Sequence, residues 1–119
     1  TELIYPWTKD ILWGEKCEQD HQLRPFIVWF GEQVPMLDIA VELVSKADLI
    51  IIVGTSMQVY PAASLTSFAA KNCSIYYLDP KPAVNEAISH LSNLTIIKQT
   101  AAKGLPELSL NLTAKFENG

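Results

Sequence analysis

A short polar turn after an apolar run is the first place in this sequence where a ligand could bind. Gly54, Thr55 and Ser56 follow the run, and Pro61 then opens a segment with helical spacing. A glycine lets a ligand approach the backbone closely, and the hydroxyls and amides of Thr55 and Ser56 suit a ribose or a phosphate. The positive end of a helix starting at Pro61 would face the same crevice. Taken alone, the motif is equally compatible with an ordinary turn.

A second stretch, residues 24–32, reads RPFIVWFGE. Apolar runs normally end in small or polar residues, whereas this one carries Trp29 and Phe30 up to a Gly-Glu pair. A strand that only filled a core would not need that order. We therefore expect this stretch to contact a ligand as well as to fold.

The composition excludes several classes of function. The chain has 119 residues, 49% hydrophobic and 18% charged, which is enough for one domain with an apolar core. A net charge of −4 without a Lys/Arg cluster argues against nucleic acid as a partner. The longest apolar run, Leu49 to Val53, is too short to span a bilayer, and we expect no signal peptide. Cys17 and Cys73 are too few for a disulfide framework, which indicates a reducing cytoplasm.

The elements that must position these residues alternate along the chain. Apolar runs predict strands at 26–30, 48–53, 74–78 and 94–97. Helices are predicted from Pro35, from Pro61 (ending at Asn72) and over the leucine-rich tail, with a helical turn at 83–90. The helix from Pro35 is expected to bury one face, formed by Met36, Ile39, Ala40, Leu43, Val44 and Ala47.

This alternation is typical of an α/β protein with a parallel sheet and helices on both faces, a Rossmann-like three-layer fold. In such folds ligands bind outside the carboxyl ends of the strands. The loops expected to form the site are 30–35, 54–60, 79–82 and 99–102.

A series of short motifs then identifies a family. They are Arg24-Pro25, Val28-Trp29-Phe30-Gly31-Glu32, Ala47-Asp48, Gly54-Thr55-Ser56 and Val59-Tyr60-Pro61-Ala62-Ala63. Their order and spacing closely resemble those of the sirtuins, the NAD-dependent protein-lysine deacylases, and most of all bacterial zinc-free members. The resemblance implies the carboxyl-terminal half of a sirtuin catalytic domain. Residues 1–22 would be a remnant of the small domain or connector, residues 23–113 half of the NAD-binding domain, and residues 114–119 a tail.

The resemblance also implies two sets of binding residues. The set for the adenosine side of NAD is Gly54, Thr55, Ser56, Tyr77, Leu78, Asp79, Thr100, Ala101 and Ala102. The set for the acyl-lysine peptide is Val28, Phe30, Gly31, Glu32, Met57 and Val59. In the family the peptide adds as a strand between the Phe-Gly-Glu segment and the loop matching residues 57–60. Phe30 would then wall the tunnel for the acyl-lysine chain.

Other parts of a sirtuin are not matched here. The family's Gly-Ala-Gly loop, its nicotinamide-ribose contacts and its general-base His lie in the amino-terminal half. His21 and His90 lack that context, so we expect no catalytic residue in this chain. Zinc-binding sirtuins carry Cys-x-x-Cys pairs ahead of the Arg-Pro strand, where this sequence has Cys17 alone, so no zinc is expected.

The predicted function is therefore part of an NAD-dependent protein-lysine deacylase that is inactive as this chain alone. Its predicted partners are an acyl-lysine protein or peptide and the missing amino-terminal half, with no nucleic acid and no membrane. The cut edge of the sheet also invites self-association. The alternative is a non-catalytic half-Rossmann module that binds NAD, ADP-ribose or peptide.

Overall fold

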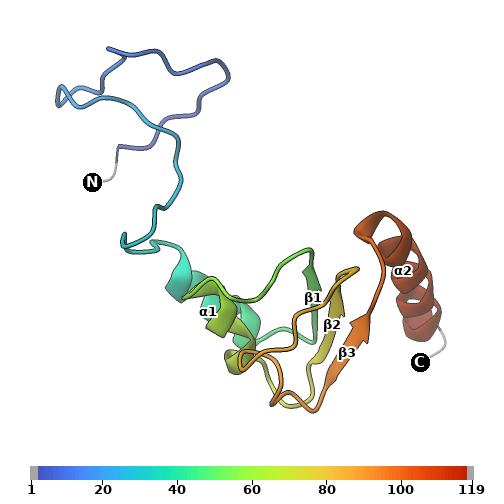
Figure 1. The fold of residues 1–119 in the computed structure, drawn as a ribbon. Coiled ribbons are helices and arrows are strands. Elements are labelled where there is room, and N and C mark those ends of the chain that lie inside the picture. The colour runs from blue at the N-terminus through green and yellow to red at the C-terminus, as the bar shows by residue number, and fades with distance from the viewer. Residues whose placement is uncertain (1–2, 118–119) are drawn as a thin grey trace. The chain divides into compact units, whose positions relative to one another are not determined.

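The computed structural model describes residues 3–117 and divides the chain into two compact units, Thr1–Val34 and Pro35–Gly119. The first unit is irregular, and the ribbon of Figure 1 draws it without an arrow or a coil. An antiparallel bridge pairs Lys16 with Gln22. It closes a small loop in which the amide of Cys17 donates to the carbonyl of His21 at 2.9 Å.

The second unit is built on a parallel sheet. Strands β1 (Leu49–Val53), β2 (Ser74–Leu78) and β3 (Leu94–Ile97) lie in the order β1-β2-β3, and both pairings are parallel. The runs LIIIV, SIYYL and LTII are rich in β-branched and aromatic residues, which fit a pleated, packed surface. This confirms the predicted parallel α/β architecture.

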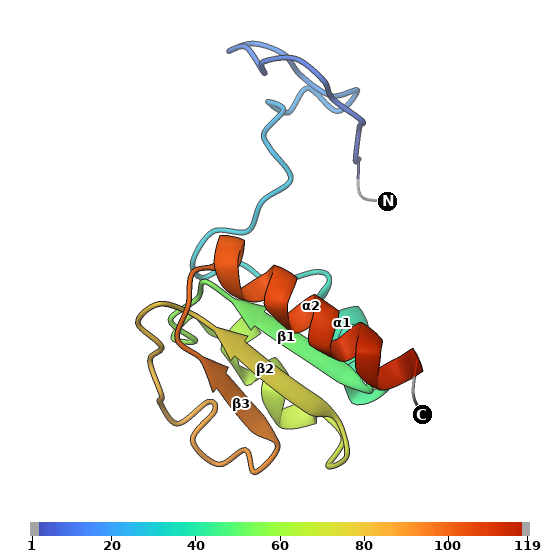
Figure 2. The ribbon, with the colours of Figure 1, turned by 90° about the vertical axis from the view of Figure 1, so that its right-hand side faces the viewer.

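Helices cover both faces of the sheet. Figures 1 and 2 show α1 (Leu37–Ser45) and α2 (Ala101–Glu117) on opposite sides of the strands, which gives the three layers predicted. The 3₁₀ helix η1 (Ala62–Phe68) packs with α1. The main core cluster is formed by Ile52, Met57, Ala63, Cys73, Ile75, Tyr77, Ala87 and Ile88.

A glycine allows α2 to approach the sheet closely. A Cβ added at Gly104 would lie 2.8 Å from Cδ2 of Leu78, closer than two carbon atoms can pack. Leu108, one turn further along α2, is also buried. The close approach packs the first turns of α2 against the carboxyl end of β2.

The predicted strand at residues 26–30 is wrong. These residues are irregular, and their exposed fractions run from 44% at Val28 to 91% at Phe30. A continuous apolar run favours a buried strand only where a neighbouring strand can accept its backbone hydrogen bonds. Within residues 3–34 the structure holds no strand to pair with it.

Several smaller expectations also differ. Helix α1 begins at Leu37 rather than Pro35. The predicted buried face is wrong in part: Met36, Ile39 and Leu43 are exposed, and no residue of α1 is fully buried. The segment after Pro61 is 3₁₀ and passes into extended backbone at Ala69, so Asn72 does not cap it. In the predicted tail, residues 114–117 continue α2, whereas 118–119, like residues 1–2, lie outside the described residues.

Candidate functional site

The carboxyl ends of the strands bring three of the predicted loops to one edge of the sheet. The amide of Gly54, after β1, donates to the carbonyl of Leu78 at 3.0 Å. The amide of Asp79, after β2, donates to the carbonyl of Ile97 at 3.2 Å. These bonds prolong the parallel ladder by one residue and hold the loops together at the edge where ligands of α/β proteins bind.

The loop after β1 is tightly folded. Gly54 has φ +60 and Met57 has φ +54, both in the left-handed region. The hydroxyl of Thr55 accepts a bond from the amide of Met57 at 3.2 Å. Ser56 and Val59 are exposed, whereas the Met57 side chain, 7% exposed, anchors the loop in the core.

Tyr77, predicted to bind the cofactor, lies underneath this loop. It has no exposed surface. Its hydroxyl donates to the carbonyl of Thr55 at 2.5 Å and accepts from the amide of Ala83 at 3.3 Å. Sequence reasoning missed a second support, Asn85, whose side-chain amide donates to the carbonyls of Ser56 and Met57. The sequence shows only an Asn at the start of a predicted turn. It does not indicate the partners of this side chain, which lie 28 and 29 residues away.

The remaining predicted cofactor residues follow β2 and β3. The half-buried carboxylate of Asp79 accepts the amide of Lys81 at 2.7 Å, and Leu78 is buried against α2. Thr100 immediately precedes α2, and its carbonyl accepts the amide of Gly104 at 2.8 Å. Thr100 and Ala102 are exposed and Ala101 is half-buried, so the positive amino end of α2 faces the surface here.

In the first unit, a tight turn displays Phe30. The amide of Glu32 donates to the carbonyl of Trp29 at 3.1 Å, and Gly31 has φ +89. A positive φ at the third residue is the requirement of a type II turn, which explains a glycine at this position. Phe30 stands at the second position and is 91% exposed.

Charged groups hold this turn. A guanidinium nitrogen of Arg24 lies 3.3 Å from both carboxylate oxygens of Glu32, and another donates to the carbonyl of Ile27 at 3.2 Å. The amide of Trp29 donates to the Glu32 carboxylate at 3.0 Å. That bond, followed by the charge of Arg24, lowers the pKa of Glu32 below its ordinary value.

The predicted peptide-binding residues are thus divided between the units. Val28, Phe30, Gly31 and Glu32 belong to the first unit, and Met57 and Val59 to the second. Across residues 3–117 no cluster of three or more His, Cys, Asp or Glu side chains could hold a metal ion. The same residues include no helix that is long and apolar enough to cross a membrane.

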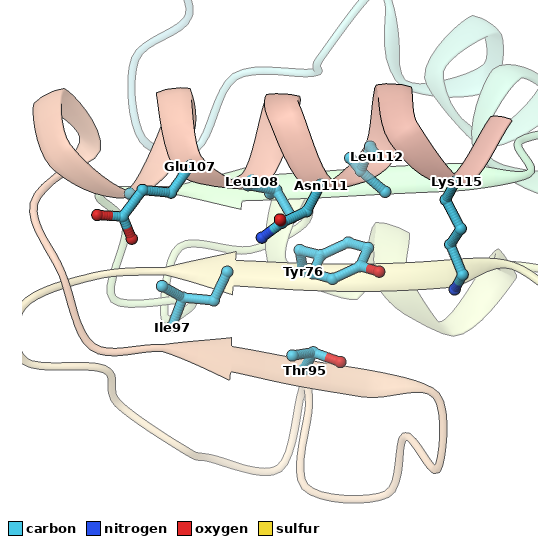
Figure 3. A pocket seen from close by; sticks show the side chains of 9 residues that line it. Tyr76, Thr95, Ile97, Glu107, Leu108, Asn111, Leu112 and Lys115 are labelled. Atoms are coloured by element: carbon cyan, nitrogen blue, oxygen red, sulfur yellow. The ribbon is translucent and has the colours of Figure 1, made fainter. Parts of the chain in front are cut away.

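A separate groove of ≈ 330 Å³ runs between α2 and the sheet. Figure 3 shows Tyr76 and Thr95 on the strands below it, with Glu107, Asn111 and Lys115 along the helix. None of the predicted cofactor or peptide residues lines it. The groove is therefore distinct from the edge formed by the three loops.

Comparison with known proteins identifies the family. The model of the Sir2 family matches residues 6–61. The chain is 50% identical over 107 residues to an NAD-dependent protein deacylase of Helicobacter pylori, covering 89% of this chain and 45% of that protein. An NAD-dependent protein deacylase of Bacteroides thetaiotaomicron is 41% identical over 106 residues, covering 88% of this chain and 44% of that protein. The chain belongs to the Sir2 family, the sirtuins.

Solved sirtuin structures share the fold. A Sir2 homologue in complex with ADP-ribose superposes with a TM-score of 0.71 at 30% identity, covering 92% of this chain and 44% of that one. A Sir2 homologue in complex with NAD gives a TM-score of 0.68 at 31% identity, covering 85% and 40%. This sirtuin chain thus spans less than half the length of the relatives it matches.

Proposed function

We propose that this chain is part of an NAD-dependent protein-lysine deacylase, and that it carries the adenosine-side contacts of NAD and one wall of the acyl-peptide cleft. The observation that carries the proposal is the edge where the loops after β1, β2 and β3 are tied together. The relatives named as deacylases, and the Sir2 homologues complexed with NAD and ADP-ribose, support the same reading.

The side chains at this edge fit the adenosine half of NAD. Ser56 and Thr100 expose hydroxyls, Asp79 offers carboxylate oxygens to ribose hydroxyls, and α2 directs its positive end outward. When bound, NAD supplies the activated ribose that accepts the acyl group and releases nicotinamide. This chain's own residues would bind and orient the adenosine end.

The peptide wall rests on two exposed segments. Phe30 and Val28 present apolar surface in the first unit, and Val59 does so in the second. A peptide added as a strand gains main-chain hydrogen bonds, which impose little demand on its sequence. The substrate class that follows is an acyl-lysine in an extended peptide.

The catalytic general base and the pyrophosphate loop would come from an amino-terminal half of the same fold. Within residues 3–117 no strand pairs with the outer edge of β1. Ile51 and Val53 of β1 remain 42% and 37% exposed, which is apolar surface that a further strand and helix would cover. On this proposal residues 23–113 form the carboxyl-terminal half of the NAD-binding domain, without zinc, in a reducing cytoplasm.

The test is nicotinamide release from an acyl-lysine peptide and NAD. We expect no detectable turnover from this chain alone, because loss of general acid–base catalysis costs about 10² to 10⁴ in rate and loss of cofactor positioning costs more. Adding the amino-terminal half of the Helicobacter pylori relative should restore activity.

In the restored enzyme Phe30→Ala should lower turnover, while Trp13→Ala, at an aromatic side chain that is 95% exposed in the same unit, should not. Turnover by the chain alone would contradict the proposal. Micromolar NAD binding by the chain alone, measured by calorimetry and without turnover in the mixture, would favour the non-catalytic module.

A further inference from the structure

Asn85 supports the loop of residues 54–60 from the segment that follows β2. Its side-chain nitrogen donates to the carbonyl of Ser56 at 3.1 Å and to that of Met57 at 2.9 Å. Its side-chain oxygen accepts the amide of Ala87 at 3.0 Å. Because a donor occupies the oxygen, the nitrogen must face the loop, and the side chain uses three of its four bonding positions.

The segment that carries Asn85 is fixed to the core. Ala87 and Ile88 are buried, at 7% and 0% exposure. The hydroxyl of Thr66, a buried residue of η1, donates to the carbonyl of Ala87 at 2.9 Å. Asn85 is therefore a rigid point against which the loop can be held.

The loop needs such a support. Met57 is a non-glycine residue at φ +54, a conformation that an L-residue with a side chain disfavours. The Met57 side chain is buried in the core. The two bonds from Asn85 stabilise the carbonyls of Ser56 and Met57, which lie on either side of the Met57 Cα. Without them, this backbone conformation would rest on the Met57 side chain and the bond to the Thr55 hydroxyl.

These bonds also set the direction of the next amides. In a trans peptide the N–H points opposite to the preceding C=O. With the carbonyl of Met57 turned to Asn85, the amide of Gln58 points away from it, toward the exposed side of the loop. Tyr77 acts in the same way on the carbonyl of Thr55, and hence on the amide of Ser56. Within residues 3–117 neither the Ser56 nor the Gln58 amide donates a hydrogen bond.

We propose that Asn85 is a positioning residue: it fixes the carbonyls of Ser56 and Met57, and thereby presents the Gln58 amide to the main chain of the substrate peptide. The identity of the ligand rests on the proposed function. The effect of Asn85 on the loop does not.

Asn85→Asp is the sharpest variant. It keeps the oxygen that accepts the amide of Ala87, but places a carboxylate oxygen against two carbonyls in place of a donor. In the ¹⁵N-labelled chain we expect the amide resonances of residues 56–59 to shift or broaden. The dissociation constant for an acetyl-lysine peptide should rise about tenfold, which corresponds to one lost hydrogen bond.

Asn93→Asp is the matched control. Asn93 also donates from its side-chain amide to a backbone carbonyl, that of Cys73, but at the amino ends of β2 and β3. The loop resonances should not move in this variant. In Asn85→Asp, acidification to about pH 4 should return them toward wild type, because the protonated carboxyl regains a donor.

If Asn85→Asp does not fold, Asn85→Ser keeps an oxygen that can accept the amide of Ala87 and removes the side-chain amide that donates to the loop. Unchanged loop resonances in the Asn85 variant, or equal changes in Asn93→Asp, would overturn the proposal, as would shifted resonances with unchanged peptide affinity. The peptide affinity is measured for the chain mixed with the amino-terminal half used above. If the wild-type mixture shows no response to the peptide, the proposed function fails, while the loop resonances still decide the role of Asn85.

Discussion

The turn at residues 29–32 and the loop at residues 54–60 both contain backbone at positive φ, but different groups stabilise them. Each presents backbone at positive φ, at Gly31 in one and at Gly54 and Met57 in the other. The turn is held from outside by the exposed charges of Arg24 and Glu32. The loop is held from beneath by neutral groups, the hydroxyl of buried Tyr77 and the amide of Asn85.

Because their supports differ, the turn and the loop should respond to different conditions. Exposed charges are screened by salt and titrate with pH. Neutral hydrogen bonds such as those from Tyr77 and Asn85 do neither, but loss of a partly buried one leaves a polar group with less access to water. The loop should therefore be sensitive to substitution of its supports, and the turn to the solution around it.

The largest effect is expected from Tyr77→Phe. It leaves the carbonyl of Thr55 without its buried donor, which should lower the free energy of unfolding by about 1–3 kcal/mol. Denaturant titration of the chain measures this. Tyr76→Phe, the same change at the neighbouring half-buried residue of β2, is the control and should cost less. Equal losses would mean that the bond to Thr55 contributes nothing specific.

A smaller effect is expected at the glycines. In Gly54→Ala the added Cβ would lie more than 4 Å from any atom beyond its two chain neighbours. Only the left-handed backbone disfavours the alanine, which should lower the free energy of unfolding by about 1–2 kcal/mol. Gly31→Ala also meets open space, but at φ +89, further from the region that alanine can adopt. We expect it to shift the Trp29 and Glu32 amide resonances while leaving the denaturation midpoint unchanged. A lowered midpoint in Gly31→Ala would show that the turn contributes to global stability.

The smallest effect on global stability is expected from Glu32→Gln, which should leave the denaturation midpoint unchanged. In the wild type the folded-state pKa of Glu32 is lowered. The carboxylate therefore stabilises the turn above the ordinary pKa of about 4.3, and this contribution is lost as pH falls through the lowered value.

In an acid titration, the Trp29 amide resonance should shift as the Glu32 carboxylate is protonated. This titration step should disappear in Glu32→Gln. Glu42→Gln, which removes the i,i+4 partner of Lys46, is the control and should leave the step in place. A step that survives Glu32→Gln would assign the titration to another group.

Much of the fold could be predicted from local pattern. The runs that form β1, β2 and β3 are rich in β-branched and aromatic residues. Along the chain they alternate with segments whose apolar residues have helical spacing, and this pattern predicts the strands. Parallel order followed from that alternation, and the ligand-binding edge from parallel order. The predicted cofactor loops accordingly meet at one edge.

The features that local pattern could not predict depended on distant partners. Residues 26–30 have the composition of a buried strand, yet no strand within residues 3–34 pairs with them. Tyr77 stays a predicted cofactor residue, but its place in the chain did not indicate that its side chain alternates to the inner face of the sheet and donates to the carbonyl of Thr55 from beneath the loop. Asn85 was missed altogether.

The sequence by itself determined strands β1, β2 and β3, their parallel order and the family. It did so because strand propensity, alternation and turn chemistry act between neighbours in the chain. Only the tertiary structure decided that Phe30 stands on a turn and that Tyr77 and Asn85 hold the loop of residues 54–60. Those outcomes depend on which backbone groups remain to be paired after packing, and bonds that span 22 to 29 residues leave no local pattern to recognise.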